Sequence, residues 1–495
     1  MNLKNLHDTI IQILNLNTTR KMKKIILSII TILFFNNTNA QNEIDALRYS
    51  TNNMIGSARY SAMGGAFGSL GGEFSSLSSN PAGLGMYQSS EFTFSPNFDL
   101  NNRTTYFNNK SSEYNSAISI GSLGLVSSIP QKNPNWKRIN FAIGWNQLAK
   151  YNNSTKIEGS SNNSIVNDFI DISNGTSVEN LLNSYSIMAW ETYLIDPDPQ
   201  NNNQYISNLS SNTKRQSKSI EQNGSMNEFI LSAASTYQDK LYVGATIGIN
   251  TLNYYEYSEY YEEEIDTTNN LRGLLFSEEI SSYGTGFNIK LGAIYRINED
   301  LKFGISFHSP KFLNIKEDYN TSITSYFKDS TLHYSIGYYM PFEYFLMTPL
   351  KSSISASKLF NNNISGFKLP LLLSAEVEMI DYSTAEYLTS DFEDENGTIS
   401  RIYQNTTNIK IGAELKINPI VLRTGYSRYG SPFVNSIDLP SENYCFGIGI
   451  DHQVYFFDVA YVLSESKTEQ ILSNNNIIPV IDTKHSMRFT LGLRF

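Results

Sequence analysis

Cysteine is almost absent from this chain, because Cys445 is the one cysteine among 495 residues. No disulfide can form within the chain, so packing and hydrogen bonds alone must hold the fold together. Charge is also scarce: charged residues make up 17% of the sequence, against about 25% in ordinary soluble domains. After residue 40 no apolar run reaches the ~20 residues that a membrane-spanning helix needs. These absences exclude a disulfide-stapled domain and a helical membrane protein.

The residues of several common functional sites are missing as well. The net charge is −10, whereas a nucleic-acid partner requires basic patches. The histidines beyond the front end, His308, His333, His452 and His485, are far apart and have no metal-ligand spacing. No G-x-S-x-G elbow is present, and the glycine-rich stretch 64–68 lacks the spacing of a phosphate loop. The sequence therefore predicts no enzyme activity, no metal site, no cofactor and no nucleic-acid partner.

What is present begins with a targeting segment. Lysines within residues 21–24 precede the apolar run Ile25–Phe35, and the small residue Ala40 follows. A basic region, a short apolar region and a small residue at the cleavage site are typical of a secretory signal peptide. We expect a signal peptide over residues 1–40, with Met22 as the true start of the protein.

The end of the chain shows a regular alternation. In Ser486–Phe495 apolar residues alternate with polar or small ones, and the last residue is aromatic. A strand sends successive side chains to opposite faces, so one face of this segment is apolar and the other polar. An outer-membrane barrel shows this pattern, and so does an edge strand of a soluble sandwich.

The rest of the chain favours the barrel. Period-2 alternation and turn residues predict about 14 strands. They are Phe92–Leu100, Ala117–Ile129, Ile139–Leu148, Phe229–Tyr237, Leu241–Leu252, Gly286–Ile297, Leu301–His308, Leu346–Ser357, Leu371–Tyr382, Asn408–Lys416, Ile420–Tyr429, Tyr444–Ile450, Val454–Leu463 and Ser486–Phe495.

The predicted connections alternate in length. They are short after most even-numbered strands, as at Gln238–Lys240 and Asp451–Gln453, and long and polar after odd-numbered strands. The long ones are Ala149–Glu228, Asn253–Thr285, Ser309–Phe345, Ser383–Thr407 and Ser464–His485. Short turns on one side and long loops on the other are typical of an outer-membrane barrel. We expect a helix at Val166–Leu194 within the first of these loops.

Charged residues lie on the polar face of the late strands. Lipid contact would cost each of them about 2–4 kcal/mol at the bilayer midplane, so we expect them to face the lumen and to pair across strands. Contact with the polar head of a ligand is the alternative. The residues are Glu376, Glu378, Lys410, Glu414, Arg423 and Arg488.

The acidic, tyrosine-rich run Tyr254–Glu264 is expected as a solvated loop beside the aromatic belt at the membrane interface. Binding of Ca²⁺ or Mg²⁺ between lipopolysaccharides is the alternative for this run.

A compact segment precedes the first strand. Residues 41–89 are rich in glycine and small residues, and ~50 residues are too few for an independent domain. A barrel of ~14 strands leaves a lumen unless something fills it. The sequence thus predicts an all-β transmembrane antiparallel barrel over residues 90–495, with residues 41–89 as a hatch inside its lumen.

The chain resembles the FadL/TodX family of outer-membrane transporters of hydrophobic compounds. The resemblance rests on G-S-A-R-Y-S-A-M-G-G-A-F-G-S-L at residues 56–70, on S-N-P-A-G-L at residues 79–84 and on the later strands. It implies a 14-stranded barrel with a luminal hatch in the bacterial outer membrane. It also implies that fatty acids or aromatic hydrocarbons enter from outside and leave sideways through the wall, near a kink in an early strand. The family's hatch element maps onto Asn80, Pro81 and Ala82.

The expected partners follow from the same resemblance. They are a hydrophobic small-molecule ligand, outer-membrane lipid, and the barrel-assembly machinery through the strand that ends at Phe495, with the chain acting as a monomer. Some relatives are adaptors in protein secretion. A receptor or adaptor that does not transport, docking a secreted protein or binding haem, therefore remains the alternative function.

Overall fold

The computed structural model describes residues 43–181, 186–209, 213–265, 268–337, 341–364, 367–434, 441–473 and 476–495. The expected signal peptide and its start at Met22 lie outside these residues. No helix within these ranges is long and apolar enough to cross a membrane.

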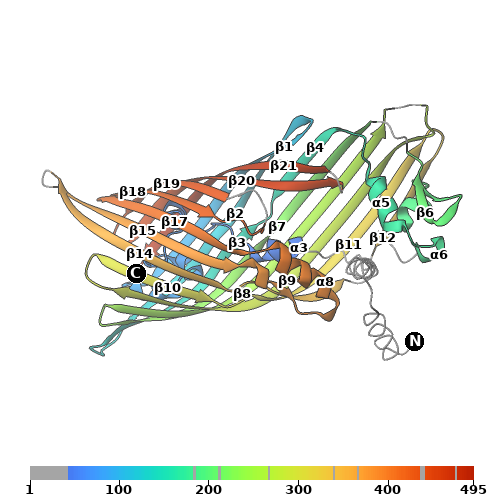
Figure 1. The fold of residues 1–495 in the computed structure, drawn as a ribbon. Coiled ribbons are helices and arrows are strands. Elements are labelled where there is room, and N and C mark those ends of the chain that lie inside the picture. Colours follow the sequence, from blue (N-terminus) through green and yellow to red (C-terminus); the bar gives the residue numbers. More distant parts are fainter. Residues whose placement is uncertain are drawn as a thin grey trace, which may run out of the picture. The chain divides into compact units, whose positions relative to one another are not determined.

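The strands form one closed antiparallel barrel with 14 segments in its wall (Figure 1). The first and last strands close it, because Glu91 pairs with Arg494 and Thr105 with Val480. The strands are β1 (Glu91–Phe107), β2 (Asn109–Pro130), β3 (Trp136–Lys150), β4 (Asn153–Ser161), β7 (Lys214–Tyr237), β8 (Leu241–Glu264), β9 (Leu271–Arg296), β10 (Leu301–His308), β11 (Phe312–Phe327), β12 (Thr331–Gly337), β13 (Phe342–Met347), β14 (Lys351–Ile364), β15 (Phe367–Asp381), β17 (Asn405–Ile417), β18 (Ile420–Tyr429), β19 (Ser441–Asp451), β20 (Tyr455–Ser473) and β21 (Asn476–Arg494). The predicted fold class is confirmed.

Three wall segments are built from more than one strand. β10 and β11 both pair with β9 and together make one segment. β12 and β13 pair with β11, and β14 pairs with β10, so these three strands make the next segment. β3 and β4 both pair with β7.

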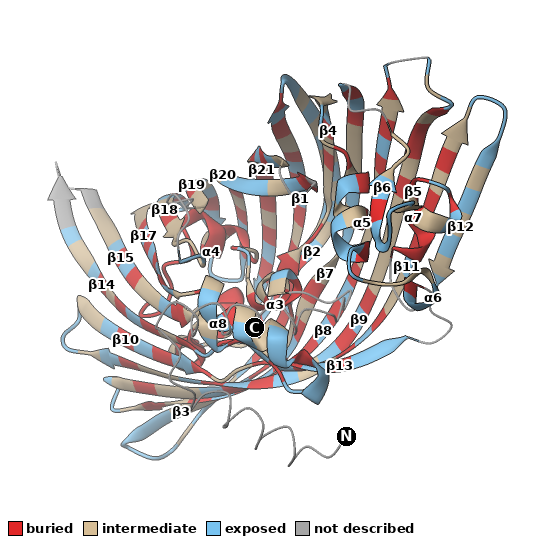
Figure 2. Cartoon of the chain, turned by 45° about the vertical axis from the view of Figure 1, so that its right-hand side comes forward, coloured by how far each residue is buried: buried red, intermediate tan, exposed pale blue. Residues whose placement is uncertain are grey.

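Alternation along each strand separates an outer from an inner face, which is visible as alternating bands of burial along the strands (Figure 2). On β8, Ile247 and Ile249 are exposed on the outer face, whereas Thr246 and Asn250 are buried on the inner face. Apolar side chains outside and polar ones inside are the arrangement that a barrel in lipid requires.

The outer face of the same strand changes further along. Beyond Asn250 it is polar at Thr251 and Asn253, both exposed, while the inner face mixes buried Leu252, Tyr254 and Tyr260 with buried Ser258, Glu262 and Glu264. A polar outer face is what a strand in water requires. β8 therefore continues out of the lipid zone into water without a break.

The structure corrects several of the loops expected from the sequence. Most of Asn253–Thr285 belongs to β8 and β9, and Tyr254–Glu264 is strand rather than loop. Ser309–Phe345 contains β11, β12 and part of β13, and most of Ser464–His485 is the hairpin of β20 and β21. The prediction was wrong because it followed apolar side chains on the outer face, and on β8 these end at Ile249 while the strand continues.

The long connection between β3 and β7 is also structured. In place of one helix at Val166–Leu194 it contains β4, the short helices α5 (Ile165–Ser173), α6 (Val178–Leu181) and α7 (Ile187–Glu191), and the hairpin of β5 (Ile195–Asp198) and β6 (Asn201–Ser207). Val166, Phe169 and Leu194 pack in a core with Tyr260 and Phe276 of the extended strands. The connection between β15 and β17 holds η3 (Tyr382–Thr384), β16 (Glu386–Tyr387), η4 (Ser390–Phe392) and α8 (Glu393–Ile402).

The N-terminal segment lies inside the barrel (Figure 1). It contains α3 (Glu43–Ser50), α4 (Ala58–Ala62), η1 (Phe74–Ser78) and η2 (Pro81–Met86). Strands around the whole ring donate hydrogen bonds to it or accept them from it, through Thr490 of β21, Glu414 of β17, Glu376 of β15, Ile305 of β10, Asn140 of β3 and Thr236 of β7. A segment bonded to strands on every side must occupy the lumen.

Candidate functional site

Asn80, Pro81 and Ala82 form the start of η2, pressed against the wall. The Asn80 side chain accepts a hydrogen bond from the Ala82 N–H at 3.0 Å and donates to the carbonyls of Gly68 at 2.6 Å and Ile305 at 3.2 Å. Pro81 at the first helical position gives up only an N–H that would have no partner within the helix. The element thus links two turns of the N-terminal segment to β10.

Glycines in the wall make room for this element. A side-chain carbon at Gly292 of β9 would overlap the Asn80 carboxamide, and one at Gly244 of β8 would overlap the Pro81 carbonyl. The backbone approach is therefore closer than any other residue at these two wall positions would permit.

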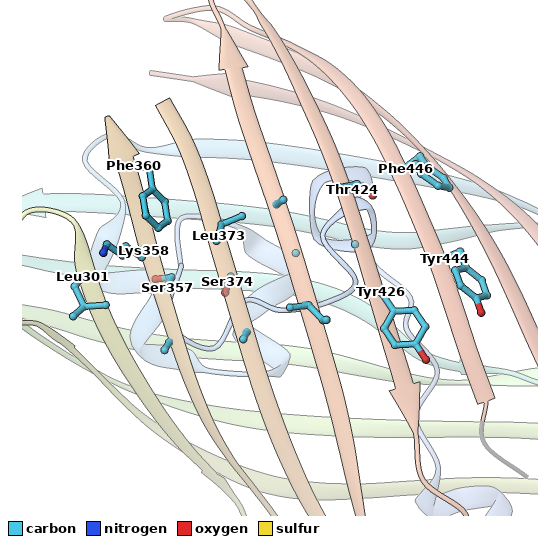
Figure 3. Close-up of a pocket in the computed structure, with 16 residues that line it drawn as sticks. Leu301, Ser357, Lys358, Phe360, Leu373, Ser374, Thr424, Tyr426, Tyr444 and Phe446 are labelled. Atoms are coloured by element: carbon cyan, nitrogen blue, oxygen red, sulfur yellow. The ribbon is translucent and has the colours of Figure 1, made fainter. Parts of the chain in front are cut away.

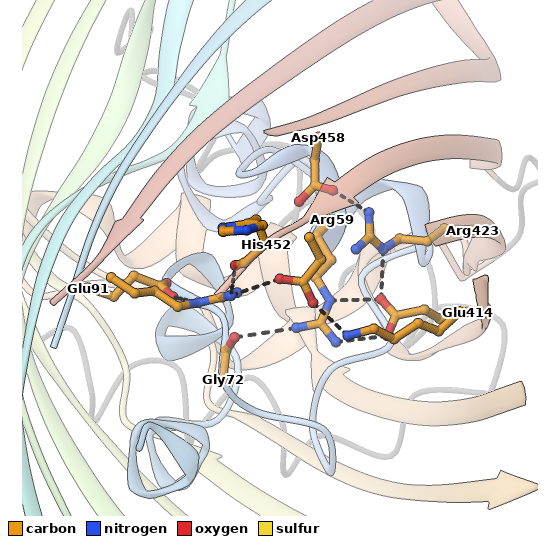
Figure 4. A network of polar contacts seen from close by, with 10 residues as sticks. Arg59, Gly72, Glu91, Glu414, Arg423, His452 and Asp458 are labelled. Atoms are coloured by element: carbon orange, nitrogen blue, oxygen red, sulfur yellow. Dashed lines mark hydrogen bonds and ion pairs between the residues drawn. The ribbon is translucent and has the colours of Figure 1, made fainter. Parts of the chain in front are cut away.

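Glu414 and Arg423 belong to a chain of ion pairs that joins the N-terminal segment to the wall (Figure 4). Glu414 accepts from Arg59 Nε at 2.9 Å and Nη2 at 3.1 Å, and from Arg423 Nε at 2.7 Å. Arg423 also donates to Asp458 of β20 at 2.6 Å. We call these four residues the paired network. Its two cations and two carboxylates balance, and its geometry gives each arginine at least one charged partner.

Glu376, Glu378 and Lys410 form a second paired group. The Lys410 ammonium lies 2.9 Å from Glu376 and 3.6 Å from Glu378. Glu376 also accepts from the backbone N–H of Gly68 at 2.8 Å, and Glu378 accepts from Asn408 at 2.8 Å. The structure thus brings five of the six expected luminal charges into two groups on β15, β17 and β18.

Two further lysines hold the end of α3. The Lys311 ammonium donates to the Tyr49 carbonyl at 3.2 Å, and the Lys351 ammonium donates to the Ser50 carbonyl at 3.4 Å. Both carbonyls lie at the C-terminal end of the helix, where a cation interacts favourably with the helix dipole.

Arg488, the sixth expected residue, lies apart from both groups. It is 4% exposed and donates to the hydroxyl of Ser61 in α4 at 2.9 Å. Its Nε is buried, and nothing among the described residues accepts a hydrogen bond from it. A buried guanidinium N–H without an acceptor costs free energy unless water or a ligand accepts its hydrogen bond.

The lumen holds a cavity of about 890 Å³ that the N-terminal segment and the wall line together. Apolar side chains line one part of it, from α3, the end of α8 and the stretch after β18: Ile44, Leu47, Ile402, Phe433 and Val434. Polar and charged side chains line the rest, among them Lys150, Lys484 and Arg488. The cavity is therefore amphipathic.

The barrel wall is interrupted next to this cavity. β2 pairs with β3 only from Ser122–Asn146 to Pro130–Arg138, so residues 109–121 of β2 have a ladder partner on the β1 side alone. β4, which continues the β3 segment along β7, instead crosses the inner face of β1. There Asn153 and Thr155 of β4 accept hydrogen bonds from Asn101 and Arg103 of β1.

A second hollow, of about 700 Å³, lies on the outer face over β14, β15, β17 and β18 (Figure 3). Small outward side chains form its floor, including Ala356, Ala375 and Ala413, and Phe360 and Phe446 stand at its rim. Because it faces outward from the wall, lipid would cover it in a membrane.

Among the described residues no group of three or more His, Cys, Asp and Glu side chains could hold a metal ion. Cys445 is buried.

Sequence reasoning missed Asp99, Lys150 and Lys484, which also line or adjoin the cavity. Lys484 could have been found by continuing the alternation of the terminal strand backwards, because Lys484, Ser486 and Arg488 share one face. Lys150 could not, because only the departure of the chain from the β2 ladder places it near them.

Comparison with known proteins shows which solved structures share this fold. No protein-family model matches the sequence, and no curated protein matches it. Solved structures do: the Pseudomonas putida toluene transporter TodX, at 11% identity and a TM-score of 0.52, covers 90% of this chain and 100% of its own. A Pseudomonas aeruginosa FadL homologue, at 12% identity and a TM-score of 0.51, covers 90% of this chain and 99% of its own. The resemblance expected from the sequence is therefore confirmed at the level of the fold.

Proposed function

We propose that this protein is an outer-membrane channel for hydrophobic or amphiphilic small molecules, such as long-chain fatty acids. The N-terminal segment acts as a hatch and the cargo leaves sideways through the wall. The observation that carries the proposal is the coincidence of a blocked lumen with a wall interrupted beside the cavity. The solved structures of the same fold, a toluene transporter and a FadL homologue, support the substrate class.

The position of the N-terminal segment across the lumen favours a lateral route over an axial one. Hydrogen bonds and ion pairs from six strands hold residues 58–85 across the lumen. A hydrophobic molecule released from the cavity into water would lose its burial free energy, about 25 cal/mol for each Å² of apolar surface. Exit into the bilayer keeps that surface buried.

The wall beside β2 offers such an exit. An intact ladder hydrogen-bonds each strand on both sides, and an unpaired edge in lipid is costly. Residues 109–121 of β2 lack a ladder partner on one side, and near the lipid-facing end of this stretch Ile118 and Ile120 on the outer face are 80% and 42% exposed. The interrupted ladder supports a wall that opens toward lipid at this point.

Uptake by liposomes tests the channel. Liposomes containing the barrel should take up labelled oleate faster than empty liposomes. The adaptor alternative predicts uptake no faster than in empty liposomes, together with a stable protein partner.

Photo-crosslinking tests the exit. A p-benzoylphenylalanine at Ile118, beside the interruption, should crosslink labelled oleate during uptake more than the same residue at Ile247. Ile247 is also exposed on the outer face but lies in β8, whose ladder is continuous on both sides. Equal labelling at the two positions would contradict the lateral route.

A further inference from the structure

We propose that the luminal cavity contains a subsite for a doubly charged anionic head group, formed by Lys150, Lys484 and Arg488. The inference rests on the proposed function and names the class of cargo: an amphiphile with a phosphate-like dianionic head, rather than a neutral hydrocarbon.

The three cations converge because of strand geometry. Lys484, Ser486 and Arg488 lie two residues apart on β21 and share its inner face. Asp99 of β1 is the direct partner of Ser486 in the ladder, so Lys484 and Arg488 flank it on either side.

Lys150 joins them from β3. Its ammonium lies 2.7 Å from Asp99 and 3.1 Å from the carbonyl of Ala117, in the part of β2 that has no ladder partner on that side. The subsite therefore lies beside the interruption in the wall, where cargo would leave.

The charges of this group do not balance. Asp99 accepts hydrogen bonds from Lys150 at 2.7 Å and from Ser486 at 2.6 Å, and the Lys484 ammonium lies 3.8 Å from it as an ion pair. The neighbouring pair of Arg103 and Asp482 is neutral in sum, with its two oxygens 2.6 and 2.7 Å from the guanidinium. One carboxylate thus faces three cations, which leaves two positive charges.

The excess is buried and directed into the cavity. Lys150 is 4% exposed at its side chain and Arg488 is 4% exposed, and all three cations line the cavity. Arg488 Nε has no acceptor among the described residues. An anion at this point would accept a hydrogen bond from Arg488 Nε and neutralise the excess positive charge. Charge-assisted hydrogen bonds are strong in such a buried site.

The apolar part of the same cavity fits the rest of such a molecule. Ile44, Leu47, Phe433 and Val434 line it, and three of them are large exposed apolar residues that an acyl chain would cover: Ile44 at 46%, Phe433 at 39% and Val434 at 44%. One cavity thus offers a cationic site for a head group and an apolar surface for a tail.

Three probes with the same twelve-carbon chain test the inference. Binding of dodecyl phosphate, dodecanoate and dodecanol is measured on the full chain in nanodiscs near pH 8, where the phosphate monoester carries about two charges. We expect dodecyl phosphate to bind about tenfold more tightly than dodecanoate, and dodecanol to bind most weakly, with a salt dependence confined to the charged probes.

Substitution locates the site. The double variant K484Q/R488Q should weaken binding of dodecyl phosphate about tenfold or more and leave dodecanol binding unchanged. Arg488→Lys and Lys484→Arg keep the charge and should restore most of the affinity. Lys316→Gln is the matched control, because Lys316 is 60% exposed at its side chain and lies outside the cavity. Heat-modified migration on gels verifies that each variant is folded.

The outcomes separate the two proposals. Equal binding of the three probes, or equal losses in K484Q/R488Q and Lys316→Gln, would overturn the anionic subsite and leave the channel intact. Failure of all three probes to bind, with oleate uptake no faster than in empty liposomes, would overturn the channel and the subsite together.

Discussion

The two halves of the lumen use charge in opposite ways. In the half filled by the N-terminal segment, the paired network balances two arginines with two carboxylates. In the half that holds the cavity, Lys150 and Lys484 pair with Asp99, and Arg488 lies on the same face of β21 as Lys484. Balanced ion pairs hold two parts of the chain together. A cluster with excess positive charge can attract an anionic ligand. The N-terminal segment is thus held by balanced ion pairs, whereas the cavity carries an excess of positive charge.

Breaking the balance in the filled half should have the largest effect. Glu414→Gln removes the charged partner that Arg59 and Arg423 share, leaving Arg423 with Asp458. We expect the free energy of unfolding to fall by about 3 kcal/mol, the low end for a broken buried pair, because Arg59 is 24% exposed at its side chain. Denaturant titration in liposomes measures the loss, and protease should cut the N-terminal segment more readily.

Glu158→Gln is the control for that experiment. Glu158 pairs with Lys156 at 2.8 Å, but both side chains are exposed, so its loss should cost under about 1 kcal/mol. Equal losses in the two variants would mean that the paired network does not hold the hatch.

Disturbing the fit without touching charge should have an intermediate effect. Gly292→Ala places a carbon where the Asn80 carboxamide lies, and overpacking of this kind costs about 1–3 kcal/mol. Thermal unfolding and protease access to the N-terminal segment report it. Gly397→Ala in α8 is the control, because a side-chain carbon there meets nothing within 4 Å. It should be neutral or slightly stabilising. A similar loss of stability in the two variants would rule out a close contact between Gly292 and Asn80.

We expect the smallest effect at Glu73. This carboxylate lies in the half filled by the N-terminal segment, but it has no ion pair within 4.0 Å among the described residues. It is 3% exposed and accepts from the Ser75 N–H at 3.4 Å. Burial raises the pKa of Glu73 above its ordinary value. The folded state therefore holds the proton more tightly than the unfolded state, so this group's contribution to stability falls as pH rises from the ordinary pKa through the raised one.

Glu73→Gln should remove that dependence. The variant should be slightly more stable than the parent at neutral pH and should differ less from it near pH 5, as measured by unfolding at both pH values. A parent protein whose stability rises over this range relative to the variant would contradict the sign.

The parts of the fold that alternation specifies were predictable. Each of the 14 predicted strands falls on a wall segment, because one face of each strand must be apolar in lipid. Asn253–Thr285 was predicted wrongly as loop because the outer face of β8 becomes polar after Ile249. A pattern tied to one face cannot follow a strand through that change of solvent.

In the candidate site, too, some features were predictable from the sequence and others were not. Glu376, Glu378, Lys410, Glu414, Arg423 and Arg488 were found because polar residues in a lipid-spanning strand must point inward. Their partners were not: Arg59 meets Glu414 across 355 residues of sequence, and Arg488 meets Ser61 across 427. The role of the six residues in ligand contact stays a prediction.

The amino-acid sequence by itself determined that this chain forms an antiparallel barrel with an apolar outside, because the period of two in its side chains admits no other arrangement in lipid. Only the tertiary structure decided where the wall is interrupted and which charges remain unbalanced. Both depend on the path of β4 across the inner face of β1 and on contacts between residues hundreds of positions apart, which no local pattern encodes.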